Sequence, residues 1–535
     1  MKRRWVAALL AGVALGGRVT PAAQPTYDVI VRGARVLDGT GAPWFYADVA
    51  VADGKIAVVG QVPAAATAPM ELDGAGLYLT PGFIDPHSHA GPALATDELS
   101  GAVPLLAQGV TTVFINPDGG GPLDLADQHR VLMAHRPAVN VAPFIGHNSV
   151  RTAVLGLDDR QPTPAELDAM RELVNNGMTE GAFGLSAGPF YTPGSFSKTA
   201  EHVELAKVAA KWGGVYTSHI RDEGDYSIGL LAAVDEVITV ARAAQLPGIV
   251  THIKALGPRV WGLSGEVIQH INTARAAGVE VFADQYPYEA SSTSLEAALV
   301  PTWVREGSRG AKLARLADVE QLGSIRKGIA ENLDRRGGAD RIQIRSYAPH
   351  PAWEGQTLAA IAFELGVDPV EATVRMVKAG GASIVSFNMQ EADILAFMQQ
   401  PWTMTCSDGA LVAFGDGVPH PRSYGTFPHK LRQYALDGDT LTLERAVHSM
   451  TGLTASIMRL RDRGLVRPGM VADLVLVDPA TIDQKSTYQD PHHLSVGVSV
   501  VVVNGQVAWR DEQSTGVRAG QWLTLAPAGA AVGTR

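Results

Sequence analysis

The sequence contains a single cysteine, Cys406, among 535 residues. An intrachain disulfide needs two cysteines, so this chain cannot form one. A zinc site built mainly from thiolates is excluded for the same reason. A lone cysteine in an apolar strand belongs more often to the core than to a metal site, and we assign Cys406 to the core.

The chain also has little positive charge and no long apolar run after residue 23. Its formal net charge is −10, and it has no stripe of Lys and Arg of the kind that neutralises nucleic-acid phosphates. We therefore expect no nucleic-acid partner. A membrane-spanning helix needs about 20 consecutive apolar residues, so we also expect no permanent membrane span.

The N-terminus has the pattern of an export signal. Three basic residues at positions 2–4 precede an apolar run over residues 5–16, and small residues follow near Ala22. This run is too short to remain in a bilayer as a spanning helix. We predict that residues 1–23 are a signal peptide and that the mature protein is periplasmic or secreted.

Strand patterns occur at both ends of the remaining chain. Residues 28–38 and 47–59 are rich in β-branched side chains, with Asp53-Gly54 as a hairpin turn, and residues 472–478 and 498–507 have the same character. Such runs, bounded by turn residues, are typical of strands. They predict a small β-sandwich domain built from residues 24–80 and 466–535.

The centre of the chain alternates apolar strands with helical segments. Eight strand candidates cover residues 82–85, 110–116, 139–145, 182–186, 215–219, 249–253, 279–284 and 401–407. Eight strand-then-helix units predict an α/β fold, a parallel (β/α)8 TIM-like barrel over residues 81–465. The stretch from about 290 to 400 is too long for one connection and predicts a helical insertion before the last barrel strand.

A pair of histidines follows the first of these strands. His87 and His89 occur in the segment Asp-Pro-His-Ser-His, which begins at residue 85. An i, i+2 pair in extended backbone projects both imidazoles to one side, where they can hold a metal ion. The alternative is a chance pair in a loop, and the pair alone does not decide between them.

Three further polar residues end barrel strands. His219 and His252 close the fifth and sixth candidates, 33 residues apart, and Asp408 follows the last. Reactive side chains in such barrels lie at the carboxyl ends of the strands. Four histidines and one carboxylate converging there suit one or two divalent cations with a position left for water. Each residue taken singly could instead be a hydrogen-bonded core residue or a cap.

Several segments together resemble the amidohydrolase superfamily and, within it, the N-acyl-D-amino-acid deacylases (D-aminoacylases). The matching segments begin at residues 85 (DPHSH), 181 (GAFGLS), 217 (TSHIRDEG), 251 (THIK), 284 (DQYPY), 407 (SDG), 420 (HPRSYGTFP) and 461 (RDRGLVRPGMVADLV). The strand-end histidines are typical of the superfamily. The segment at residue 420 narrows the resemblance to the deacylases.

The resemblance implies metal-assisted attack of water on an amide carbonyl. His219 and His252 would hold a tightly bound zinc, and His87 and His89 would belong to a second, weaker divalent site. Asp408 would take a proton from the water and return it to the departing amine, as a carboxylate beside an activated water can do.

One position departs from the family pattern. Members typically carry a cysteine after the second strand that helps to bridge the metals, and Asp118 stands in that place here. A carboxylate is a competent but harder ligand, so we predict that Asp118 is a metal ligand. Two alternatives remain open: Asp118 is only a turn residue before three glycines, or Glu180 supplies the bridge.

Binding of an acylated amino acid also requires a cation for its carboxylate. A guanidinium does this best, and Arg422, in the segment typical of the deacylases, is the first candidate. The resemblance adds Lys254, Tyr191, Tyr286 and Ser292 as substrate-binding residues. His147, His350 and His420 are interpreted as supporting or structural histidines.

These residues predict hydrolysis of a linear amide that carries a free carboxylate, most simply an N-acyl-D-amino acid. An alternative keeps the same chemistry but acts on dipeptides, cyclic amides or amide-linked xenobiotics. A non-enzymatic alternative is an inactive barrel used for binding or assembly. It predicts missing ligands or a missing proton carrier, and this sequence retains both. The sequence leaves stereospecificity, the number of metals and the oligomeric state open.

Overall fold

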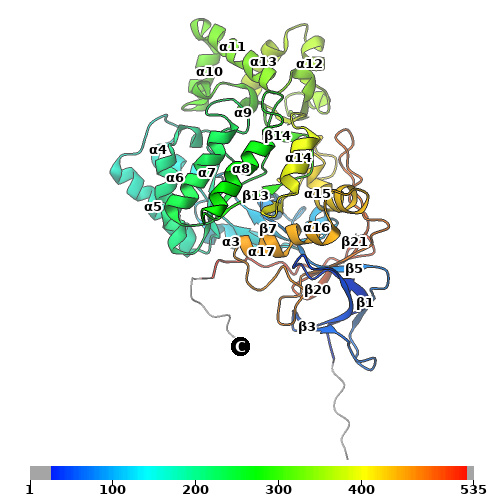
Figure 1. Ribbon diagram of the computed structural model, residues 1–535. Coiled ribbons are helices and arrows are strands. Elements are labelled where there is room, and N and C mark those ends of the chain that lie inside the picture. Colours follow the sequence, from blue (N-terminus) through cyan, green and yellow to red (C-terminus); the bar gives the residue numbers. More distant parts are fainter. Residues whose placement is uncertain (1–25, 527–535) are drawn as a thin grey trace, which may run out of the picture.

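The computed structural model describes residues 26–526. Figure 1 shows three parts: a sheet built from strands near both ends of the described chain, a central body of strands and helices, and a unit carrying α10–α13 at the opposite end. The predicted signal segment, residues 1–23, lies outside the described residues. Within residues 26–526, no helix combines the length and apolar character needed to cross a membrane.

The central body is built on two parallel sheets. One has six strands in the order β17 (Thr403–Thr405), β13 (Val281–Gln285), β12 (Gly248–Val250), β11 (Val215–Ser218), β10 (Gly184–Ala187) and β9 (Ile145–Gly146). The other has three, in the order β6 (Phe83–Asp85), β7 (Val110–Ile115) and β8 (Asn140–Pro143). Each of the eight predicted central segments contains a strand, so this mixed α/β centre is confirmed.

Helices follow these strands along the chain. They are α1 (Gly91–Leu94), α2 (Val103–Leu106), α3 (Leu125–Ala134), α4 (His147–Leu155), α5 (Pro164–Thr179), α6 (Thr199–Lys211), α7 (Leu230–Ala244), α8 (Ser264–Ala276), α15 (Arg422–Leu431), α16 (Leu443–Met450) and α17 (Gly452–Ile457), and α14 (Glu391–Met398) precedes β17. The start of α5 shows why a helix begins there. Thr163 and Glu166 form a capping box, which satisfies backbone N–H groups that the helix leaves free.

The strands are apolar because both of their faces are covered. On one side Phe114, Phe144 and Phe183 pack into a shared core with Met404. On the other, strand residues such as Leu185 pack against the helices that follow them. Strands buried on both faces read as continuous apolar runs, which is why the sequence predicts them well.

A nine-stranded sheet combines strands from both ends of the chain. Its order is β21 (Gln513–Ser514), β20 (Gln506–Arg510), β19 (Val498–Val503), β18 (Leu474–Val477), β5 (Tyr78–Pro81), β1 (Val29–Val36), β2 (Phe45–Ala52) and β3 (Lys55–Gly60), with β4 (Met70–Asp73) paired to β1. The hydrogen bonds join all nine strands into one continuous sheet, where the sequence predicts a β-sandwich. β5 pairs with β18, and this pair joins the two ends of the chain.

The insertion before β17 is mixed rather than purely helical. It contains α9 (Leu295–Leu299), α10 (Arg309–Ala317), α11 (Val319–Arg335), α12 (Leu358–Glu364) and α13 (Pro369–Ala379). It also contains an antiparallel sheet of β14 (Ser291–Ser294), β16 (Ser383–Ser386) and β15 (Ile342–Ser346). The short strands, rich in serine, lacked the apolar pattern from which strands were predicted elsewhere.

A buried ion pair joins the terminal sheet to the central body. Asp473 pairs with Arg463, and it accepts hydrogen bonds from Asn140 Nδ2 at 3.0 Å and from the Asn504 backbone N–H at 2.7 Å. Asn140 begins β8, so one carboxylate connects a central strand, the terminal sheet and the segment before β18. After β21 the chain continues along the central body, where Leu523 donates its N–H to the Val141 carbonyl at 2.8 Å.

We predict that Asp473→Ala lowers the free energy of unfolding by about 3 kcal/mol, because it leaves the buried Arg463 charge with only the exposed Asp462 carboxylate as a partner. Chemical denaturation followed by circular dichroism measures this change. The control is Asp483→Ala, which removes an exposed pair with Lys485 and is expected to cost less than about 1 kcal/mol. Equal effects of the two substitutions would contradict the structural role given to Asp473.

Candidate metal centre and active site

The side chains predicted to carry chemistry meet at the carboxyl ends of the parallel strands. His87 follows β6, Asp118 follows β7, and His252 follows β12. Asp408 follows β17. The backbone is left-handed at Asp118, His252 and Asp408, where φ is 55°, 34° and 49°. Residues other than glycine rarely adopt this conformation, and it concentrates at functional sites.

Asp118 lies at the centre of the four histidines. Its Oδ1 is 3.3 Å from His87 Nε2, 3.6 Å from His252 Nε2 and 3.9 Å from His219 Nδ1. Its Oδ2 is 3.4 Å from His89 Nε2. One carboxylate therefore faces all four predicted imidazole ligands.

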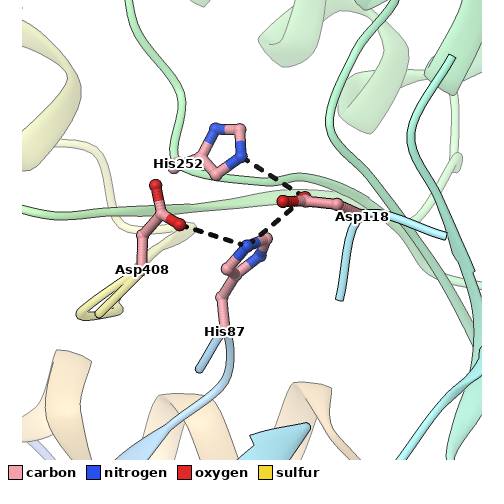
Figure 2. Close-up of side chains that lie close together, drawn as sticks. All are labelled: His87, Asp118, His252 and Asp408. Carbon is pink, nitrogen blue, oxygen red and sulfur yellow. Dashed lines mark ion pairs between the residues drawn. The ribbon is translucent and has the colours of Figure 1, made fainter. Parts of the chain in front are cut away.

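Two overlapping groups have ligand atoms close enough together to hold a cation. The first contains His87, Asp118, His252 and Asp408, and the second contains His219 and His252 with Glu223. Figure 2 shows the first group, in which side chains from four separate segments point toward one another. His252 belongs to both groups, so the structure can accommodate two neighbouring metal positions.

Glu223 is a site residue that the sequence analysis missed. Its Oε1 is 3.0 Å from His252 Nδ1 and 2.5 Å from Lys254 Nζ. Its Oε2 is 3.8 Å from His219 Nε2. The signal was present, because Glu223 lies four residues after His219 within a segment that resembles the deacylases, but no role was assigned to it.

The site contains buried polar atoms that protein groups do not satisfy. Among residues 26–526, both ring nitrogens of His87, Asp118 Oδ1 and His219 Nε2 have no hydrogen-bond partner. Leaving such groups unpaired in the interior costs free energy. Imidazole nitrogens and carboxylate oxygens are the donors that zinc accepts, so this unsatisfied set fits a divalent metal.

The electrostatics of the site also favour a bound cation. Burial alone would raise the pKa of Asp118, but the charge of His87 and hydrogen bonds from the surrounding histidines hold it well below the usual range. Burial opposes protonation of His89, yet hydrogen bonds to Asp118 and Asp408 raise its pKa to about 9. These two carboxylates therefore stabilise a positive charge at this position, which a bound cation would supply in place of the proton. Burial lowers the pKa of His219 to about 4, which keeps that ring neutral as a ligand requires.

Asp408 connects the metal site with the predicted carboxylate anchor. Its Oδ1 is 3.1 Å from His89 Nε2, and its Oδ2 is 2.7 Å from Arg422 Nη1. Burial would raise the pKa of Asp408, but the neighbouring Arg422 charge, followed by His252, holds it well below the usual range. The Arg422–Asp408 ion pair was not predicted from the sequence.

A cavity of about 800 Å³ opens above this site. All five predicted substrate-binding residues line it: Tyr191, Lys254, Tyr286, Ser292 and Arg422. The Tyr286 ring lies under the Arg422 guanidinium at 4.8 Å, and its hydroxyl has no partner among the described residues. The Tyr191 hydroxyl forms a hydrogen bond with Thr293 Oγ1 at 3.2 Å. Lys254 Nζ lies 2.6 Å from His252 Nδ1.

Comparison with known proteins identifies the family. The sequence profile of the amidohydrolase family matches residues 71–508 of this chain. The chain belongs to the amidohydrolase family. Among its relatives is an N-acyl-D-glutamate deacylase of Alcaligenes xylosoxydans xylosoxydans, 35% identical over 504 residues that cover 90% of this chain and 93% of the relative.

Solved structures of amidohydrolases agree with the fold. An N-acyl-D-glutamate deacylase from Bordetella bronchiseptica, complexed with zinc and a phosphonate that mimics the tetrahedral intermediate, is 33% identical with a TM-score of 0.80. It covers 94% of this chain and 100% of its own. A D-aminoacylase with a binuclear metal centre, activated by one metal and attenuated by a second, is 33% identical with a TM-score of 0.79, covering 93% and 100%.

The backbone of this amidohydrolase fixes Asp118 tightly between neighbouring strands. Ser186 on β10 donates its hydroxyl to the Asn116 carbonyl at 2.7 Å and accepts from the Gly119 N–H at 3.2 Å. Gly188 is required beside this turn, since a Cβ there would lie 2.3 Å from the Asp118 carbonyl oxygen. The Asp118 carboxylate points to the histidines and accepts no hydrogen bond from the amides of its own turn.

Glu180, the alternative bridging ligand, and Cys406 both lie in other surroundings. Glu180 accepts hydrogen bonds from the N–H groups of Leu125 at 2.7 Å and Ala126 at 3.1 Å, so it caps the start of α3. Cys406 is fully buried in a hydrophobic cluster. Burial and the nearby charge of Asp284 raise the pKa of its thiol well above the usual range, which disfavours the thiolate that metals bind.

The three supporting histidines have different surroundings. His420 accepts the Arg422 N–H on Nδ1 at 3.0 Å and donates from Nε2 to the Ala290 carbonyl at 2.9 Å, so it positions Arg422. His147 pairs with Glu201 in a separate buried cluster. His350 is exposed in the insertion and stacks on Trp353.

We predict that Asp118→Ala loses bound zinc, whereas Glu180→Ala retains it. Removal of the central carboxylate takes one ligand from between the two groups, while loss of the α3 cap costs only about 1 kcal/mol of stability. Elemental analysis after dialysis measures the metal content of both variants. Full zinc retention in Asp118→Ala, or zinc loss in Glu180→Ala, would contradict this assignment.

Proposed function

We propose that this protein is a zinc-dependent deacylase that hydrolyses N-acyl-D-amino acids to a D-amino acid and a carboxylate. One observation carries the proposal: four histidines surround Asp118, and Asp408 lies between them and the buried Arg422 at the base of one cavity. Relatives that are 33–35% identical over most of the chain are deacylases of this kind.

The metal would be held by the two overlapping groups around Asp118. His219 and His252 would provide the tighter position, and His87 and His89 would contribute to the second. Zinc at these positions would supply Lewis acidity, which polarises the amide carbonyl and makes a bound water easier to deprotonate. Asp118 would serve both positions, because its two oxygens face different histidines.

Asp408 would carry the proton in this reaction. Its depressed pKa keeps the carboxylate ionised and able to accept a proton from the attacking water. The new C–O bond forms as that proton moves to Asp408. The C–N bond then breaks as Asp408 returns the proton to the departing amine, which leaves a free carboxylate and an amino acid.

The substrate carboxylate would bind at Arg422. This guanidinium is buried, and its Nη1 has no hydrogen bond of good geometry among the described residues despite the ion pair with Asp408. Tyr286, whose hydroxyl has no partner among the described residues, and Ser292 line the same cavity. Lys254 and Tyr191 contact the histidines, so they would orient the reacting amide near the metal.

We infer further that the two parallel sheets form one (β/α)8 barrel. Phe183 donates its N–H to the Pro143 carbonyl at 2.9 Å, which links β10 with the end of β8. On the opposite side Asp408 donates to the His87 carbonyl at 2.9 Å. The terminal sheet would be a second domain, with residues 24–80 and 466–535 as its two parts.

An exported location is the proposal that fits the N-terminal pattern. The basic residues and the apolar run that follows them support cleavage near residue 23. N-terminal sequencing of the protein from the periplasmic fraction would show the mature start.

Two other readings of the site predict different behaviour. An enzyme for cyclic amides has no use for Arg422, because such rings lack a free carboxylate. A binding protein without catalysis has no use for an ionised Asp408 beside the metal ligands. The retained pair of Arg422 and Asp408 therefore favours hydrolysis of linear substrates.

We predict that the zinc-loaded protein hydrolyses N-acetyl-D-amino acids and neither their L enantiomers nor hydantoins. A panel assay of released amine measures this. Asp408→Asn is the matched variant, since it should keep zinc and lose activity by about a hundredfold or more. Activity on hydantoins alone, or wild-type turnover by Asp408→Asn, would refute the proposed function.

A further inference from the structure

Arg345 is a cation of the catalytic cavity that the proposed reaction does not use. It lies on β15 of the insertion, it is half-buried, and its side chain lines the same cavity as Arg422. The sequence analysis gave it no role, because it follows no central strand.

Arg345 differs from the other cations of the cavity in having no partner. Arg422 pairs with Asp408, Lys254 pairs with Glu223, and Arg336 donates to the Tyr226 hydroxyl at 2.7 Å. The Arg345 side chain makes no hydrogen bond, ion pair or ring contact with any residue in the described range 26–526. Asp416 and Asp408 are the acidic groups that influence its charge, and neither forms an ion pair with it.

An unpaired guanidinium in this position is unfavourable without an anion. Burial lowers the pKa of Arg345, and the like charge of Arg422 lowers it further. Two guanidinium groups in one cavity repel each other, and a bound carboxylate relieves this because it forms charge-assisted hydrogen bonds with such a group. The cavity thus has an anchor for a second anion in addition to the one at Arg422.

Backbone hydrogen bonds connect Arg345 to the segments that carry Arg422 and Ser292. Val418 donates its N–H to the Arg345 carbonyl at 2.8 Å, which ties β15 to the segment that leads into His420 and Arg422. β15 also pairs with β16, whose other neighbour β14 carries Ser292. The two guanidinium groups are therefore presented by connected elements.

We propose that Arg345 binds a side-chain carboxylate of the substrate, so that the enzyme prefers N-acyl-D-amino acids with an acidic side chain. This inference rests on the proposed function and deepens it. Arg422 takes the α-carboxylate, which every N-acyl amino acid has. Arg345 is then free for the second carboxylate, and a dicarboxylic substrate satisfies both cations at once.

The test compares N-acetyl-D-glutamate with N-acetyl-D-glutamine, which has nearly the same shape but no side-chain charge. Wild-type enzyme should have a kcat/KM at least about tenfold higher for the glutamate substrate. Arg345→Met should lower kcat/KM for glutamate by about ten- to a hundredfold, mainly through KM, and change glutamine by less than about threefold. Arg345→Lys should recover part of the glutamate activity. The control is Arg375→Met, an exposed residue of the same insertion that pairs with Glu371.

The outcomes separate this inference from the proposed function. Equal wild-type activity on both substrates would overturn the role of Arg345 while leaving the deacylase intact. An equal loss on both substrates in Arg345→Met would also overturn it, because the residue would then serve the α-carboxylate or the fold. Failure to hydrolyse any N-acyl-D-amino acid would overturn the proposed function, and this inference with it.

Discussion

The carboxylate of Asp118 is the group on which the rest of the site depends. Four imidazoles from three different strand ends lie within 3.9 Å of its two oxygens. A negative charge between the imidazoles favours a cation at this position, and without a cation the buried ligand atoms remain unsatisfied. The local fold serves this arrangement: left-handed backbone at Asp118 and a glycine at position 188 allow the carboxylate to reach the centre.

Around this centre, the charges of Asp408, Arg422, Glu223 and Lys254 are paired with one another or with the histidines. Asp408 faces the histidines through one oxygen and Arg422 through the other, so one side chain links the predicted metal ligands to the predicted carboxylate anchor. Glu223 joins His252 to Lys254. The insertion completes the cavity from outside the parallel strands, and it is there that Arg345 stands without a partner. Chemistry therefore comes from strand ends, whereas side-chain selection comes from the insertion.

The sequence predicted the parts of the structure that depend on local pattern. Apolar runs marked the central strands, and His219 and His252 marked their carboxyl ends. The position of Asp118 was predicted by its place after the second strand. The ion pair between Arg422 and Asp408 was not, because it depends on how α15 packs rather than on spacing. Arg345 was missed for the same reason: β15 has no catalytic motif, and only the tertiary fold brings it to the cavity.

The central claim is that an oxygen ligand from Asp118 takes the place of a thiolate. X-ray absorption at the zinc edge tests it most directly, because a sulfur ligand lies farther from zinc than a nitrogen or oxygen ligand does. The account predicts a first shell of nitrogen and oxygen at about 2.0–2.1 Å and no sulfur. A sulfur shell at about 2.3 Å would contradict it, because Cys406 would then supply the thiolate and Asp118 would not stand in for the family cysteine.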